Sequence, residues 1–294
     1  MKSGFVSLVG RPNVGKSTLL NSIIGKKIAI ISDKPQTTRN LIQGIYNEED
    51  TQIVFVDTPG IHKPKHKLGK YLNKQTYYTI NDVDVIVFLI DGSESLGPGD
   101  KYVIEKLKEA NKPVILAINK IDKLNKDEIL LKIDEYKDLY NFQEIVPLSA
   151  LKNDNVDTLI KVIKKYLPDT IKYYEDNGVT NKPLEFMMAE IIREKVLMLT
   201  EEEVPHSVTC VIEHFEKKDD IYTINATIIV DRESLKKIII GKKGNKIKEI
   251  GILSRQDLES LLGGKVYLDL YVKTIKKWRN KEKYLAEFGF NKFE

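Results

Sequence analysis

Apolar residues in the first half of the chain form short runs that alternate with segments of helical periodicity. The runs typical of strands are Phe5–Val9, Leu41–Tyr46, Ile53–Val56, Val85–Ile90, Val114–Ile118 and Ile145–Pro147. The helical segments are Thr18–Ile24, Pro98–Ala110, Glu128–Tyr140 and Val156–Tyr166. This alternation predicts a mostly parallel sheet with helices on both faces. The second and third strands are separated by the polar residues 47–50 and lie too close in sequence for a crossover helix, so we expect that pair to be antiparallel.

The pattern changes beyond residue 170. Residues 171–182 are polar, lack apolar periodicity and are predicted to form a linker. The segments that follow predict a helix at Leu184–Leu199 and then strands at Val208–Phe215 and Tyr222–Val230. Two helices come next, at Glu233–Ile240 and at 245–262, the second with an interruption near Gly251. A strand at Val266–Val272 and a basic helix around Trp278 complete the order. We therefore predict an α/β domain over residues 1–170 and an α+β domain over residues 183–294.

The composition is that of a soluble globular protein, with 41% hydrophobic and 31% charged residues among 294. No apolar stretch approaches the roughly 20 residues that span a bilayer, and the first strand begins too close to Met1 for a signal peptide, so we expect a cytoplasmic protein. Cys210 is the only cysteine, which excludes a disulfide within the chain. The net charge of +4 is mild, but lysines crowd one short stretch: Lys236, Lys237, Lys242, Lys243, Lys246 and Lys248.

A phosphate-binding loop connects the first predicted strand to the first predicted helix. Its residues are Gly10, Arg11, Pro12, Asn13, Val14, Gly15, Lys16, Ser17 and Thr18. A strand that turns through two glycines into a helix leaves backbone N–H groups pointing at one place, where the helix dipole adds positive potential. Lys16 is expected to reach the β- and γ-phosphates, and the Ser17 hydroxyl to hold Mg²⁺.

Further polar residues follow the other strands, whose carboxyl ends meet at one edge of the sheet. They are Asp57, Thr58, Pro59 and Gly60 after the third strand, Asn119, Lys120 and Asp122 after the fifth, and Ser149, Ala150 and Leu151 after the sixth. Asp57 would share the Mg²⁺ of Ser17, and the Gly60 N–H would touch a γ-phosphate. Asp122 can accept two hydrogen bonds from guanine, whereas adenine offers no such pair of donors. The sequence therefore predicts GTP rather than ATP.

These motifs together resemble those of the translation-factor-like GTPases, and the resemblance covers the first half of the chain. It implies that a threonine in the polar loop 32–39, Thr38 by its match, closes onto Mg²⁺ when a γ-phosphate is present, and that residues 61–75 form a second switch loop. Ile61 stands where the best-known small GTPases have a water-orienting glutamine, so we expect slow unaided hydrolysis. Asn13 matches relatives in which this residue helps to hold K⁺; stabilising the turn is the alternative role.

The second half resembles a type II KH RNA-binding domain, because Gly241 and Gly244 lie between two helices in the matching order of elements. The glycines would let a single-stranded RNA backbone lie against the loop, facing the free N–H groups of the next helix. The residues assigned to RNA are Ile240, Gly241, Lys242, Lys243, Gly244, Lys246 and Lys248, and a groove for bases is expected from Ile238, Ile239, Ile240 and Ile247. A purely structural helix-turn-helix is the alternative.

Both halves together resemble the Era family of bacterial GTPases over nearly the whole chain. The segments of the second half that carry this resemblance are Glu190–Lys195, Glu202–Ser207, Ile240–Gly244 and Ile247–Gly251. The resemblance implies GTP or GDP with Mg²⁺ as ligands, and binding near the 3′ end of 16S rRNA. It also implies a role in assembling the small ribosomal subunit and peripheral association with the inner membrane. No obligate protein partner is inferred.

Two other functions fit parts of the pattern. The lysine cluster could instead meet anionic lipid, which would make the chain a membrane-surface GTPase, or it could bind a protein partner. A phosphotransferase acting on a small molecule would need an acceptor pocket, for which the sequence offers no residues. We therefore predict a GTP-hydrolysing switch whose nucleotide state changes how the KH domain is presented to RNA.

Overall fold

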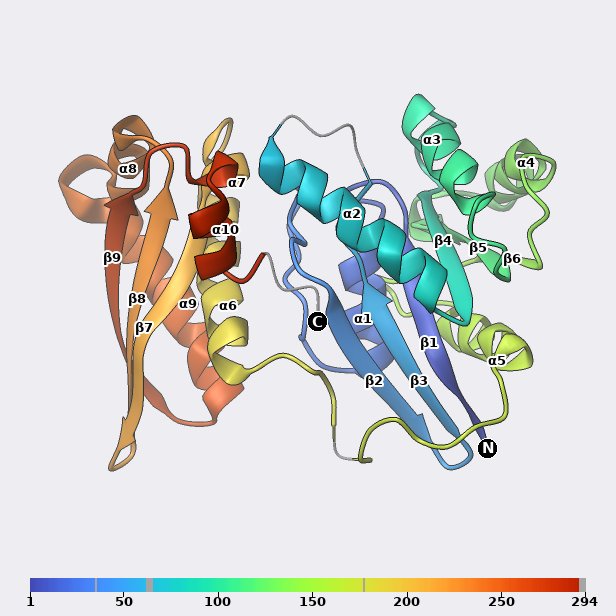
Figure 1. Ribbon diagram of the computed structural model, residues 1–294, viewed down its shortest axis with the longest axis horizontal. Helices are drawn as coiled ribbons and strands as arrows, with labels where there is room; N and C mark the ends of the chain where they lie inside the picture. The colour runs from blue at the N-terminus through green and yellow to red at the C-terminus, as the bar shows by residue number, and fades with distance from the viewer. Residues whose placement is uncertain (35, 62–65, 177, 291–294) are drawn as a thin grey trace. The chain divides into compact units, whose positions relative to one another are not determined.

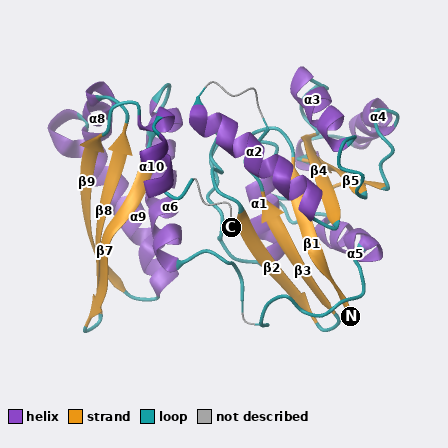
Figure 2. Ribbon diagram, viewed as in Figure 1, coloured by secondary structure: helices purple, strands orange, loops and turns teal. Residues whose placement is uncertain are grey.

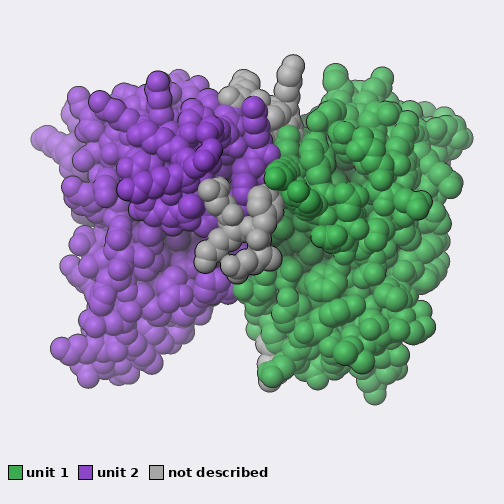
Figure 3. Space-filling model, viewed as in Figure 1, with its two compact units in different colours: residues 1–29, 38–64, 72–181 green, residues 30–37, 65–71, 182–294 purple. Residues whose placement is uncertain are grey.

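The computed structural model describes residues 1–34, 36–61, 66–176 and 178–290. The chain divides into two compact units, which Figure 3 shows in different colours. The first comprises residues 1–29, 38–64 and 72–181, and the second comprises residues 30–37, 65–71 and 182–294. Two short segments therefore belong to the second unit although the sequence on both sides of them belongs to the first.

The first unit is built on a six-stranded sheet with the order β2-β3-β1-β4-β5-β6. Its strands are β1 (Lys2–Val9), β2 (Ile42–Glu48), β3 (Thr51–Asp57), β4 (Val85–Asp91), β5 (Val114–Asn119) and β6 (Glu144–Pro147). Neighbouring strands are parallel except for the pair β2 and β3, which is antiparallel. The predicted strands and their one antiparallel pair are thereby confirmed, and the carboxyl ends of the five parallel strands, β1, β3, β4, β5 and β6, lie at one edge of the sheet.

Helices cover both faces of this sheet, as predicted. They are α1 (Lys16–Ile24), α2 (Lys67–Asp82), α3 (Pro98–Leu107), α4 (Lys126–Lys137) and α5 (Val156–Tyr166), with a short 3₁₀ turn η1 (Ile121–Lys123). Figure 1 shows α1 and α2 on opposite faces of the strands. Val103 of α3 and Tyr136 of α4 are buried in one cluster with Phe88 and Leu116 of the sheet. The parallel strands are thus buried on both sides.

Helix α2 corrects the prediction of a loop over residues 61–75. The helix begins at Lys67, and Leu68, Leu72, Thr76 and Ile80 recur every four residues as buried positions. Lysines and tyrosines between these positions obscure the periodicity in the sequence. His62, which the predicted loop includes, lies outside the described residues. The loop prediction is therefore wrong from residue 67 onward.

The second unit packs helices against a three-stranded sheet with the order β7-β8-β9 (Figure 2). Its elements are α6 (Leu184–Leu199), α7 (Val204–Ser207), β7 (Thr209–Lys218), β8 (Ile221–Val230), α8 (Glu233–Ile240), η2 (Lys242–Gly244), α9 (Asn245–Leu262), β9 (Lys265–Thr274), η3 (Trp278–Asn280) and α10 (Glu282–Glu287). β8 pairs antiparallel with β7 and parallel with β9. α9 runs without the predicted break at Gly251, because the helix is long enough to absorb one glycine. No helix in the described part of the chain combines the length and apolar character needed to cross a bilayer.

Residues 171–181, predicted as part of a linker, lie against β2 and β3 of the first unit. The side chain of Gln52 is fully buried and accepts hydrogen bonds from the backbone N–H groups of Tyr173 and Tyr174, at 2.7 and 2.9 Å. The backbone N–H of Ile45 donates to the carbonyl of Val179 at 3.1 Å. This segment is therefore anchored through its backbone despite its polar sequence.

Candidate nucleotide and RNA sites

The loop between β1 and α1 has two glycines for which no other side chain has room. A Cβ at residue 10 would lie 2.4 Å from the carbonyl oxygen of Leu89, and one at residue 15 would lie 2.2 Å from Nδ2 of Asn119. Gly15 also has a left-handed φ of 102° and precedes α1 without a side-chain cap. The first N–H groups of α1 therefore face the loop, where an anion can accept their hydrogen bonds.

Lys16 lies across this loop and is almost fully buried. Its Nζ donates to the carbonyl oxygens of Gly10 and Arg11, at 3.2 and 2.8 Å. Burial lowers the pKa of Lys16 to about 8, and the attraction of Asp57 only partly opposes this shift. A polyphosphate within reach would restore the full charge of this lysine.

Three oxygen groups from three different elements meet beside Lys16. The Ser17 hydroxyl donates to Oδ2 of Asp57 at 2.7 Å, and the Thr38 hydroxyl lies 2.9 Å from Ser17 Oγ and 3.2 Å from the same carboxylate oxygen. Burial raises the pKa of Asp57, although the positive charge of Lys16 acts to lower it. Oδ1 of Asp57 is buried and has no hydrogen-bond partner among the described residues. Hydroxyl and carboxylate oxygens around an unsatisfied buried oxygen fit Mg²⁺, so Ser17, Thr38 and Asp57 could hold that ion.

The segment after β3 packs closely on the phosphate-binding loop. A Cβ at residue 60 would lie 2.7 Å from the backbone nitrogen of Pro12, and the Thr58 hydroxyl donates to the carbonyl of Leu8 at 2.8 Å. The side chain of Ile61 is buried in the core of the first unit, while its N–H donates to the carbonyl of Gly10 at 3.4 Å. Ile61 therefore supplies no polar side chain to an attacking water.

The residues assigned to the base lie at the ends of β5 and β6. Asn119 joins them to the phosphate-binding loop, because its Nδ2 donates to the carbonyl of Val14 at 2.8 Å and its Oδ1 accepts from the N–H of Ala150 at 2.9 Å. The Ser149 hydroxyl donates to Oδ1 of Asp122, and the remaining lone pairs of this carboxylate can accept hydrogen bonds from a ligand. Leu151 is exposed and offers only its backbone.

Asp91 belongs to this group, although the sequence analysis missed it. Nζ of Lys120 lies 2.5 Å from Asp91 Oδ2 and donates to the carbonyl of Asn13 at 2.8 Å. Burial acts to raise the pKa of Asp91, but hydrogen bonds from Lys120 and Ser93 stabilise its ionised form and hold the pKa below its usual value. Asp91 ends β4, so the rule that functional residues follow strands could have found it.

Arg11, assigned to the nucleotide, directs its side chain elsewhere. Its guanidinium pairs with the buried Asp100 at 2.8 Å and with Glu94 at 2.9 Å. Only its backbone carbonyl faces Lys16. Arg11 therefore anchors the phosphate-binding loop to α3 and the segment before it.

The loop between α8 and α9 presents charge on a strained backbone. Gly241 and Gly244 have φ values of 72° and 77°, and Lys243 between them has a φ of 51°. A Cβ at residue 241 would lie 2.7 Å from Cβ of Lys246. Lys242 and Lys243 are exposed on this loop and Lys248 on the following helix, while Ile240 and Lys246 are half-buried. The glycines thus hold two lysines outward beside the first N–H groups of α9.

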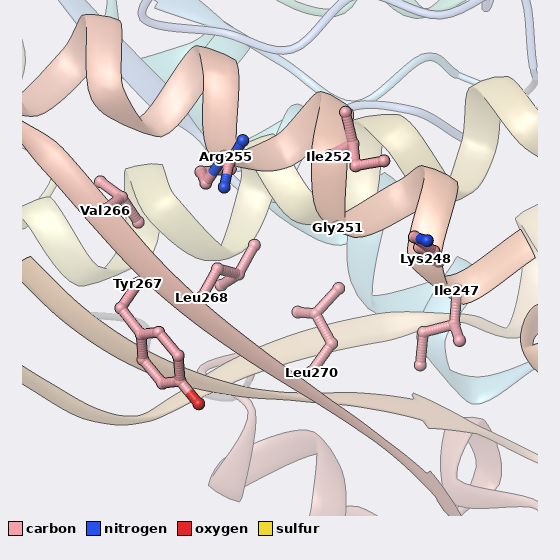
Figure 4. Close-up of a pocket in the computed structure, with 9 residues that line it drawn as sticks. All are labelled: Ile247, Lys248, Gly251, Ile252, Arg255, Val266, Tyr267, Leu268 and Leu270. Carbon is pink, nitrogen blue, oxygen red and sulfur yellow. The ribbon is translucent and has the colours of Figure 1, made fainter. Parts of the chain in front are cut away.

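A groove of about 400 Å³ lies between α9 and β9 (Figure 4). Its lining residues are Ile247, Lys248, Gly251, Ile252, Arg255, Val266, Tyr267, Leu268 and Leu270. Figure 4 shows Leu268 and Leu270 directed toward α9, and Tyr267 directed to the other side of the strand. Of the four isoleucines predicted to line a groove, only Ile247 does so. Ile239 is buried in the core and Ile238 is exposed on α8, so that part of the prediction is wrong.

Two family models match the chain. The model of the 50S ribosome-binding GTPase matches residues 5–120, and the model of the KH domain matches residues 203–279. Two similar solved structures are Era in complex with MgGDPNP and nucleotides 1506–1542 of 16S ribosomal RNA, and an Aquifex aeolicus Era variant bound to GDP·AlF₄⁻. Each is 46% identical in sequence, has a TM-score of 0.95, and matches over 99% of both chains.

Proposed function

The chain belongs to the Era family of GTPases, and on that premise we propose that it hydrolyses GTP and binds the 3′ region of 16S rRNA during assembly of the small ribosomal subunit. GTP hydrolysis is inferred chiefly from one observation: the oxygen atoms of Ser17, Thr38 and Asp57 lie within hydrogen-bond distance of one another beside Lys16. These groups have the chemistry that a triphosphate with Mg²⁺ requires, and Asp122 has the chemistry that guanine requires.

Hydrolysis is slow without assistance, because Ile61 cannot orient or deprotonate water. Positioning and electrostatic stabilisation by the phosphate-binding loop supply the catalysis that remains. A K⁺ ion beside Asn13 would add positive charge where the transition state develops negative charge. Asn13 has a left-handed φ of 65°, and its carbonyl is held by Lys120.

RNA binds in the groove between α9 and β9 and along the loop of Gly241 to Gly244. The groove combines apolar walls with exposed Lys248 and Arg255 at its rim, which suits bases and phosphates respectively. A 46% identical Era has been solved with nucleotides 1506–1542 of 16S ribosomal RNA, which supports the same RNA region here. This role places the protein in the cytoplasm.

A membrane-surface GTPase with a lipid-binding lysine cluster remains the second candidate, because Lys242 and Lys243 are exposed. The variant Gly244→Asp separates the two. At φ 77° an aspartate strains the loop and adds negative charge where RNA phosphate would lie, while every lysine is kept. RNA binding should fall by at least about tenfold, because both the strained loop and the added charge oppose it, whereas binding to vesicles with anionic lipid should fall by no more than the roughly fivefold that one added charge costs.

Gly263→Asp is the matched control, since Gly263 also has a left-handed φ and open space but lies at the other end of α9. Filter binding with an oligonucleotide of nucleotides 1506–1542 and flotation with vesicles measure the two affinities. Loss of vesicle binding with intact RNA binding would favour the lipid function. Equal RNA affinity of the GTP- and GDP-bound forms across a salt series would contradict coupling between the two sites.

A further inference from the structure

Helix α6 holds the backbone of Ile31 and Thr37 in the segment 30–37, which ends directly before Thr38. Both the helix and this segment belong to the second unit. Nη2 of Arg193 donates to the carbonyl oxygen of Thr37, and Oε1 of Glu194 accepts a hydrogen bond from the N–H of Ile31 at 2.9 Å. Ile30 is buried in the same hydrophobic core as Ile192 of α6. The segment is therefore fixed near both of its ends.

The guanidinium of Arg193 is itself held in a fixed direction. Glu190 accepts from its Nε at 2.7 Å and from its Nη2 at 2.6 Å, and Arg193 is only 1% exposed. A buried pair of this kind gains little net stability, because both ions lose their hydration. What the pair does supply is a planar donor aimed at one carbonyl.

The bond to Thr37 determines how Thr38 is presented. The carbonyl of Thr37 and the N–H of Thr38 share one planar peptide unit, so an orientation fixed on one side is fixed on the other. The Thr38 hydroxyl lies 3.2 Å from Asp57 Oδ2 and 2.9 Å from Ser17 Oγ. A displacement of about 1 Å in a reacting or ligating group can cost roughly 100-fold in rate.

The same turn of α6 also contacts the helix that lines the RNA groove. Nζ of Lys195 lies 3.2 Å from Glu194 Oε2 and 2.6 Å from Oδ2 of Asp257 on α9. α9 supplies one wall of the groove. Consecutive residues, 193–195, therefore contact both the loop before Thr38 and the RNA-lining helix.

We propose that Arg193 and Glu194 are positioning residues for GTP hydrolysis, which hold the backbone of Thr37 and Ile31 so that Thr38 can bind Mg²⁺. Lys195 links the same turn of α6 to α9. RNA bound in the groove therefore changes the affinity of Thr38 for Mg²⁺, and Mg²⁺ bound at Thr38 changes the affinity for RNA to the same degree. The proposal rests on the proposed function and names the residues that couple its two sites. It also gives a physical role to the segment Glu190–Lys195, which the nucleotide and RNA sites leave unexplained.

The test uses the full chain with the double variant Glu190→Gln/Arg193→Gln. Both charges of the pair are removed together, so neither partner is left as a lone buried charge. We expect kcat for GTP to fall by at least about tenfold, the loss that follows when a charged hydrogen bond is removed from the positioning of Thr38. The half-saturating Mg²⁺ concentration should rise, while KM and the affinity for GDP change less than about twofold. An oligonucleotide of nucleotides 1506–1542 should change the kcat of the parent chain but leave the kcat of the double variant unchanged.

Two further variants sharpen the result. Glu194→Ala, which removes the acceptor for Ile31, should lower kcat in the same way. Arg232→Gln is the matched control, because Arg232 is an arginine of the same unit whose side chain is 53% exposed. If the double variant matches Arg232→Gln in kcat, Mg²⁺ dependence and response to RNA, the positioning role is wrong.

A purely structural role has a different signature. Parallel losses of GDP affinity, RNA affinity and melting temperature in the double variant would overturn the proposal, because they report a damaged fold rather than a misplaced threonine. Failure of the parent chain to hydrolyse GTP or to bind the oligonucleotide would contradict the proposed function itself. The two failures are therefore distinguishable.

Discussion

Asn119 lies directly against Gly15, so that a Cβ on residue 15 would be 2.2 Å from the Asn119 side-chain nitrogen. That nitrogen donates to Val14, and the amide oxygen of the same side chain accepts from Ala150. One buried side chain thus connects the phosphate-binding loop to the loop assigned to the base. The two halves of the nucleotide site are consequently positioned as one piece.

Gly15→Ala should abolish binding of both GTP and GDP. The methyl group would displace Asn119, and φ 102° is unfavourable for alanine. Gly25→Ala is the control, because Gly25 also has a positive φ of 70° but has no atom within 4 Å of the added Cβ. The control should lose about 1 kcal/mol of stability and bind nucleotide normally. Titration calorimetry with GDP measures the difference, and normal binding by Gly15→Ala would contradict this account.

Asp122→Asn should remove the preference for guanine. The carboxylate would accept from two donors of the base, whereas an amide would present its own N–H₂ group to one of them. GTP affinity is expected to fall by about 100-fold or more, since each hydrogen bond to a charged acceptor contributes roughly 1.5–3 kcal/mol. In the parent chain, inosine triphosphate, which lacks the 2-amino group, should bind with intermediate affinity between GTP and ATP. Competition against a fluorescent GDP tests this order, and equal binding of GTP and ATP would exclude guanine recognition by Asp122.

GTP affinity should decrease as the pH rises above 8. The pKa of Lys16 is lowered to about 8 in the nucleotide-free protein, and bound phosphates raise it, so binding above pH 8 takes up a proton. Affinity can then fall by up to about tenfold per pH unit. The same shift means that the stability of the nucleotide-free protein increases from pH 8 toward 10.5, because the unfolded chain binds more protons in that window.

Calorimetry at pH 9 in two buffers of different ionisation enthalpy measures the proton uptake. Lys16→Arg, whose guanidinium stays charged, should bind more weakly but lose the pH dependence. An affinity for GTP that is constant between pH 8 and pH 9.5 would contradict a lowered pKa of Lys16.

Replacing K⁺ by Na⁺ should slow GTP hydrolysis without changing the affinity for GDP. The expectation comes from Asn13, whose side chain would help to hold a monovalent ion where negative charge develops. Asn13→Asp, which keeps an oxygen ligand, should retain the response to K⁺, whereas Asn13→Ala should lose it. Phosphate release in buffers of equal ionic strength is the measurement. Equal turnover in both salts would leave Asn13 with only its role in the turn.

The strand ends of the first unit were predictable because each carries polar residues directly after a buried apolar run. Helix α2 was not, since its buried positions are separated by lysines and tyrosines that read as a basic loop. Asp91 obeys the same positional rule as Asp57 but forms no familiar tetrapeptide with its neighbours. Sequence motifs therefore pointed to the residues assigned to the ligand more readily than to the residues that orient them.

In the second unit the order of elements was predictable, but the lining of the groove was not. Ile238, Ile239 and Ile240 are consecutive on α8, so they point in different directions and cannot share one face. The groove is lined instead by residues of α9 and β9, among them Gly251 and Leu270. Which residues of this helix and this strand face each other depends on tertiary packing, which a single sequence does not encode locally.

β2 is an edge strand, and residues 179–181 lie along it through the backbone bond between Ile45 and Val179 and a bridge between Gly44 and Thr180. An uncovered edge strand exposes unpaired backbone N–H and C=O groups, with which a strand of another molecule can form hydrogen bonds. A fragment truncated after residue 170 would lose this cover and is expected to self-associate. A fragment that continues through Asn181 keeps its own edge occupied, and this is where the nucleotide-binding half would be cut for separate expression.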